Sequence, residues 1–163
     1  MSLRRFIMRA MRRNLLPIIT VVLCTVGIPI RAVTPQSSAT GKIKTAIRAV
    51  LDAQAAAWNR GDIEAYMDGY DRSPHTEFVG GDTITRGWET VLDRYRQRYS
   101  TREKMGTLTF SDLEFTILGK DAALVLGRWR LKRTGDEPHG TFTLLFRKTR
   151  AGWKIIHDHT SSA

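Results

Sequence analysis

Cysteine is almost absent from this chain of 163 residues, which contains only Cys24. A disulfide needs two cysteines, so we expect none, and no thiol nucleophile or cysteine-based zinc site follows residue 39. The sequence also lacks the Gly-x-Gly-x-x-Gly, P-loop, Gly-x-Ser-x-Gly and His-Glu-x-x-His motifs. It therefore does not predict the dinucleotide, nucleoside-triphosphate, serine-hydrolase or zinc-protease sites that these motifs mark. We expect neither a cofactor nor a metal.

Acidic residues are absent from residues 1–39, which carry six arginines. The whole chain has 26 basic and 16 acidic residues and a net charge of +10, so 20 basic residues and a charge of only +4 remain after residue 39. The densest basic segment there spans residues 94–104. Helical spacing turns its tyrosines, Tyr95 and Tyr99, toward the interior, so we interpret the arginines as a solvated face. No nucleic-acid partner is predicted.

The arrangement of residues 1–39 is that of an export signal. Arginines precede an apolar stretch too short for the ~20 residues of a membrane span, and small polar residues follow as far as Ala39. We predict a signal peptide over 1–39 and an exported domain, periplasmic or secreted, over 40–163. Arg12 and Arg13 resemble a twin-arginine signal. The alternative is an uncleaved inner-membrane anchor, in which case this segment is the protein's membrane contact.

Apolar residues at spacings of three and four predict three helices early in the remaining chain. The first begins at Lys42, the second is short and capped by Asp62, and the third runs over residues 88–99. Four polar or aromatic side chains lie on the inward stripes of these helices and are candidates to line a pocket: Gln54, Tyr66, Trp88 and Tyr95.

From Gly106 the apolar pattern alternates with a period of two, which is typical of strands. A short hairpin is predicted earlier, over 76–79 and 83–85, and four long strands follow, over 108–118, 122–131, 141–148 and 153–160. The apolar parity of the first long strand changes near Ser111 and Asp112, which predicts a β-bulge. Helices followed by a meander predict an α+β domain, with a cone-like curved antiparallel sheet wrapped over the N-terminal helices and a pocket between them.

Two elements carry a resemblance to a known family. One is Trp58-Asn59-Arg60-Gly61-Asp62, and the other is Gly152-Trp153-Lys154-Ile155 followed by His157-Asp158-His159-Thr160-Ser161. Over residues 42–161 the chain resembles the SnoaL-like, nuclear transport factor 2-like superfamily with its cystatin-like cone fold. It is most similar to the bacterial branch of unknown function related to the association domain of calcium/calmodulin-dependent kinase II. The resemblance implies the cone fold and a homodimer, but fold alone does not decide among binding, catalysis and oligomerisation.

His157 and His159 are two residues apart on the last predicted strand, so we expect both on one face with Trp153 and Ile155. Three interpretations remain open for them: ligands of a metal, acid/base groups, or side chains that fix the strand end or line a pocket. The resemblance implies that Arg128 faces the pocket, as an arginine does in the kinase association domain. The alternation of its strand does not decide this, because Leu124 and Leu126 share its face.

We therefore expect an exported, homodimeric domain that binds a small molecule, anionic or aromatic, with an activity that is not specified. Its predicted ligand-binding residues are Arg128, His157, His159, Gln54, Tyr66, Trp88 and Tyr95. The alternative is an acid/base enzyme (an isomerase, dehydratase or cyclase), for which His157, Tyr66 and Tyr95 are the catalytic candidates. The third class is an oligomerisation module without a ligand.

Overall fold

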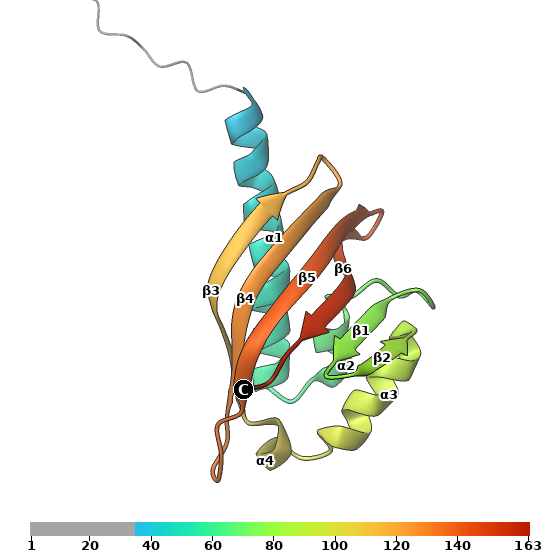
Figure 1. Cartoon of the computed structure of the whole chain (residues 1–163), viewed down its shortest axis with the longest axis vertical. Helices are drawn as coiled ribbons and strands as arrows, with labels where there is room; N and C mark the ends of the chain where they lie inside the picture. The colour runs from blue at the N-terminus through green and yellow to red at the C-terminus, as the bar shows by residue number, and fades with distance from the viewer. Residues whose placement is uncertain (1–34) are drawn as a thin grey trace, which may run out of the picture. The chain divides into compact units, whose positions relative to one another are not determined.

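The computed structural model describes residues 35–163, and Figure 1 shows their arrangement. Most of the predicted signal peptide, with Cys24, lies outside the described residues. The helices are α1 (Pro35–Asn59), α2 (Ile63–Met67), α3 (Trp88–Arg98) and α4 (Arg102–Met105). The strands are β1 (Glu77–Gly80), β2 (Thr83–Arg86), β3 (Thr107–Ile117), β4 (Ala122–Lys132), β5 (His139–Thr149) and β6 (Gly152–Thr160). Within residues 35–163, no helix combines the length and the hydrophobicity that a membrane span requires.

All six strands form one curved, unclosed sheet in the order β2-β1-β6-β5-β4-β3. Neighbouring strands are antiparallel except β1 and β6, which run parallel. The helix α1 crosses one face of the long strands, while α2 and α3 lie near the β1–β2 hairpin (Figure 1). This confirms the predicted α+β class, with a curved sheet over N-terminal helices.

The helix boundaries follow local chemistry. Asp62 caps α2 as predicted, because its side chain accepts a hydrogen bond of 2.9 Å from the amide of Ala65. α1 begins at Pro35, earlier than the predicted Lys42, and therefore runs through Ala39, the predicted end of the signal peptide. α4 is a single turn capped by the side chain of Thr101, and the sequence pattern does not predict it.

A β-bulge interrupts β3 where the sequence predicted one. The β3–β4 register shifts between Ser111 and Glu114, and Asp112 takes a positive φ of 51°. The extra residue restores Leu113, Phe115 and Ile117 to the inward face that Leu108 and Phe110 occupy, so the strand bends without losing its apolar side.

A second bulge, in β6, was not predicted. Phe146 pairs with Ile155 and Leu145 pairs with His157, so Ile156 has no partner on β5. Because successive side chains alternate between faces, one extra residue exchanges the faces of everything after it. Trp153 and Ile155 point into the core, but beyond the bulge the buried side chain is that of Asp158. The expectation that His157 and His159 share the face of Trp153 and Ile155 is therefore wrong.

The core fills the space between α1–α3 and the inner face of the sheet. On β4 the inward side chains are Ala123, Val125 and Leu131, all buried, whereas Arg128 is exposed on the outer face. The expectation that Arg128 faces inward is wrong. Its strand carries leucines on both faces, so the alternation could not distinguish them.

Candidate functional site

A cavity of about 100 Å³ lies between the helices and the inner face of the sheet. We call it the tyrosine cavity. Fourteen residues line it: Gln54, Trp58, Tyr66, Tyr70, Tyr95, Tyr99, Leu108, Phe110, Trp129, Leu131, Phe142, Leu144, Asp158 and Thr160. The predicted pocket between helices and sheet is therefore present.

Every tyrosine of the sequence lines this cavity. The chain has four tyrosines, two on or next to α2 and two on or next to α3. The rings of Tyr95 and Tyr99 stack with their centroids 5.6 Å apart, and the Trp58 ring meets Tyr99 edge-on at 4.7 Å. Aromatic walls of this kind can bind a flat apolar molecule by burial and ring contacts.

Asp158 is the one carboxylate that lines the tyrosine cavity, and it is 6% exposed. Its Oδ2 accepts a hydrogen bond of 2.8 Å from the Tyr70 hydroxyl, and its Oδ1 accepts one of 2.6 Å from the Thr160 hydroxyl. Burial raises the pKa of Asp158, and these two hydrogen bonds oppose the rise only in part. A buried carboxyl with a raised pKa, in the wall of an apolar cavity, is a candidate for proton exchange.

The tyrosine hydroxyls extend this polar group along the cavity wall. The hydroxyls of Tyr66 and Tyr70 lie 3.5 Å apart. Burial raises the pKa of Tyr66, Tyr70 and Tyr95 above that of a free tyrosine, and the nearby Asp158 charge raises each further. The three phenols therefore stay protonated at neutral pH and can donate hydrogen bonds.

Three of the predicted pocket residues lie together here, namely Gln54, Tyr66 and Tyr95. The Gln54 side chain is buried and donates a hydrogen bond of 3.0 Å to the backbone carbonyl of Tyr66. Gln54 thus holds α2 against α1 as well as lining the cavity. The predicted Trp88 is not among the lining residues. Its indole donates to the carbonyl of Met67 at 2.8 Å, so Trp88 joins α3 to α2.

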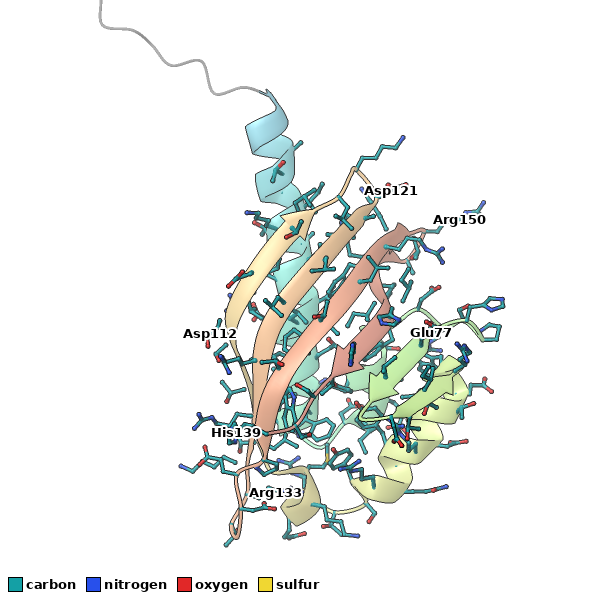
Figure 2. All side chains as sticks on the ribbon, in the orientation of Figure 1. Glu77, Asp112, Asp121, Arg133, His139 and Arg150 are labelled. Carbon is teal, nitrogen blue, oxygen red and sulfur yellow. The ribbon has the colours of Figure 1, made fainter. Side chains whose placement is uncertain are left out.

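The other predicted anchors lie outside the tyrosine cavity. His157 lies on the outer face of the sheet, where its Nδ1 is 3.1 Å from Glu77, and His159 is exposed. Arg128 pairs with Asp112 at 3.2 Å. Figure 2 labels the two acidic partners, Glu77 on β1 and Asp112 on β3, and shows them toward opposite edges of the sheet. Even among themselves, these predicted anchors do not form one site.

Asp158 is a site residue that the sequence does not predict, because strict alternation from Trp153 and Ile155 puts His157 and His159 on their face and Asp158 on the opposite one. The β6 bulge reverses this assignment. No local signal marks the bulge, because Ile155 and Ile156 are both apolar and either can point inward. Within residues 35–163, no three histidine, cysteine, aspartate or glutamate side chains gather as a metal site.

Residues 47–163 match the model of the SnoaL-like domain family. An NTF-2 like protein of unknown function from Shewanella oneidensis is 39% identical, with a TM-score of 0.70 over 72% of this chain and 98% of that one. A nuclear transport factor 2-like superfamily protein from Salmonella enterica is 21% identical (TM-score 0.61; 75% and 92% covered). A candidate scytalone dehydratase from Novosphingobium aromaticivorans is 10% identical (TM-score 0.66; 78% and 88% covered). The last two share the fold alone, and no curated protein matches the chain.

Proposed function

We propose that this chain, which belongs to the SnoaL-like domain family, binds a small aromatic molecule in the tyrosine cavity. The observation that carries the proposal is an aromatic-walled cavity with one buried carboxyl, Asp158, at its wall. A site that is mostly apolar, with few polar groups, is the usual form of a small-molecule pocket. An oligomerisation module needs no such cavity and no buried carboxyl with a shifted pKa, so this third class has less support.

Thermal shifts against a library of monocyclic and bicyclic aromatic compounds test the proposal. A compound that binds only the folded protein, at a hundred times its Kd, stabilises it by about 2.7 kcal/mol. The variant Leu131→Phe adds volume inside the cavity, whereas Leu118→Phe makes the same change at a side chain that is 58% exposed. We expect the library hits to be lost in Leu131→Phe and kept in Leu118→Phe. Hits that survive in both variants would show that they bind elsewhere and would contradict the proposal.

Asp158 favours a second candidate function, an acid/base enzyme of the isomerase, dehydratase or cyclase kind. A carboxylate can take a proton from a carbon of the bound molecule, while a protonated tyrosine donates a hydrogen bond to the oxygen where charge develops. Tyr66 and Tyr95 have the protonated hydroxyls that this role needs. In this second function the residue that takes the proton is Asp158, because His157, a catalytic candidate from the sequence, lies outside the cavity beside Glu77.

Deuterium exchange separates binding from catalysis. Each library hit is incubated with the protein in D₂O, and its C–H signals are followed by NMR. An enzyme of this kind exchanges one specific proton of its substrate, and Asp158→Asn abolishes the exchange because an amide is not a base at neutral pH. Binding without exchange for every hit supports the binding function alone.

The homodimer and the export are proposals as well. The outer face of the sheet presents Leu124, Leu126 and Leu145, and Leu126 is 41% exposed. This apolar strip supports a second copy of the chain as its partner.

The arginine-rich segment over residues 1–39 supports export, which N-terminal sequencing of the protein recovered from the periplasm or medium would test.

A further inference from the structure

A second pocket, of about 290 Å³, adjoins the tyrosine cavity. The two share five lining residues: Tyr95, Tyr99, Trp129, Asp158 and Thr160. We call the second pocket the outer pocket. Its other walls are the end of β1, the β1–β2 turn and the face of α3 that carries Arg94 and Arg98. A ligand larger than one ring can therefore occupy both spaces at once.

Arg94 and Arg98 are one helical turn apart, so their side chains leave α3 on the same side. The Arg94 guanidinium donates a hydrogen bond of 2.8 Å to the Thr85 hydroxyl. The Arg98 guanidinium lies 5.7 Å from the centre of the Tyr99 ring. Both contacts hold the arginines beside the pocket without neutralising their charge.

The charge of these two arginines is not balanced by an ion pair with any residue between 35 and 163. Arg96, which lies between them in the sequence, differs because it pairs with Glu64 at 2.7 Å and with Asp93 at 3.1 Å. The one carboxylate that lines the outer pocket is Asp158, and its two oxygens already accept hydrogen bonds from the hydroxyls of Tyr70 and Thr160. The outer pocket therefore presents two guanidinium groups whose charge an incoming anion would balance.

Resting on the proposed function, we infer that the ligand is an aromatic acid. Its ring lies in the tyrosine cavity, and its carboxylate lies in the outer pocket against Arg94 and Arg98. A guanidinium binds a carboxylate through two parallel hydrogen bonds, which is more favourable than its contact with a neutral amide. The acidic group sits at the pocket mouth, so its charge is kept away from the apolar interior.

The test compares 3-phenylpropionate with 3-phenylpropionamide, which have nearly the same shape and differ in charge. Kd values are measured by calorimetry for the wild type and for the variants Arg94→Gln, Arg98→Gln and Arg96→Gln. The last removes the same charge from the same helix at a position outside both pockets. The melting temperature of each variant, taken without probe, shows that it is folded.

We expect the wild type to bind the acid at least about five-fold more tightly than the amide, and added salt to reduce this ratio. The ratio falls toward one in Arg94→Gln and Arg98→Gln and is kept in Arg96→Gln. Equal binding of acid and amide by the wild type would overturn the inference while leaving the aromatic site in place. The inference would also be overturned if Arg96→Gln lost the acid-to-amide preference as fully as the other two variants, or if the wild type bound neither probe. The proposed function is tested separately, by the thermal-shift library and the variant Leu131→Phe.

Discussion

The hydroxyl of Tyr70 donates a hydrogen bond of 2.8 Å to the carboxylate of Asp158, 88 residues further along the chain. Both side chains are buried, at 2% and 6% exposure. The bond joins the segment after α2 to the last strand, and it fixes the one carboxylate in the wall of the tyrosine cavity. We expect the stability of the fold and its pH dependence to depend on this bond.

Removing the Tyr70 hydroxyl leaves Oδ2 of a buried carboxyl without its donor. We expect Tyr70→Phe to lower the free energy of unfolding at pH 7 by about 1–3 kcal/mol, the usual result of leaving a buried acceptor unpaired. Tyr99→Phe is the matched control, because the Tyr99 hydroxyl has no hydrogen bond within residues 35–163, and its effect should stay within about 0.5 kcal/mol. Urea denaturation measures both values, and equal losses would contradict the role assigned to Tyr70.

The pH dependence of stability reports on Asp158. Its pKa is raised by burial above the unfolded value of about 3.9, so the folded state holds the proton more tightly. The contribution of the protonated carboxyl is fully present below about pH 4 and is lost as the pH rises through the folded pKa.

Asp158→Asn stays neutral at every pH, so its stability relative to the wild type should improve as the pH rises from 4 to 8. Urea denaturation at each pH measures this difference, and Asp52→Asn, at an exposed aspartate, provides the comparison for a surface charge. A difference that is constant with pH would mean that folding leaves the pKa of Asp158 unchanged.

Because Arg128 and His157 lie on the outer face of the sheet, we expect their substitution to leave ligand binding unchanged. Neither side chain lines the tyrosine cavity, so Arg128→Ala and His157→Ala should bind any hit of the aromatic library with the wild-type Kd, within about two-fold. Calorimetry on the two variants measures this. A loss of about ten-fold or more in either variant would place the binding site on the outer face of the sheet.

A charged residue in the leucine strip of the outer face should prevent self-association. If two copies pack through this face, Leu126→Glu buries a carboxylate in the interface, so we expect a monomer where the wild type is a dimer. Light scattering coupled to size-exclusion chromatography measures the mass of the wild type and of the variant. A monomeric wild type would contradict the proposed homodimer.

The sequence predicts the position and inward face of an element correctly where one face is apolar and the other is polar. The four long strands were predicted to within two residues at each end, and the β3 bulge was predicted because Leu108 and Phe110 differ in parity from Leu113. The Asp62 cap was predictable because the interaction is local, spanning three residues.

The sequence does not predict which side chains point inward where both faces of a strand carry similar side chains. On β4, Leu124 and Leu126 face outward opposite Val125 and Leu131, so the face of Arg128 had no marker. On β6, the adjacent Ile155 and Ile156 conceal the bulge that brings Asp158 inward. Register of this kind depends on the pairing with β5 and on packing across the sheet, which no local pattern records.

Fluorine NMR of protein labelled with 3-fluorotyrosine tests whether the tyrosine cavity binds an aromatic molecule, because all four tyrosines of the chain line that cavity. Four resonances are expected, and every one reports on the cavity. We expect titration with an aromatic library hit to shift several of them in a saturable manner, with the Kd found by calorimetry. A compound that binds by calorimetry and leaves all four resonances unmoved would show that the tyrosine cavity is not the binding site.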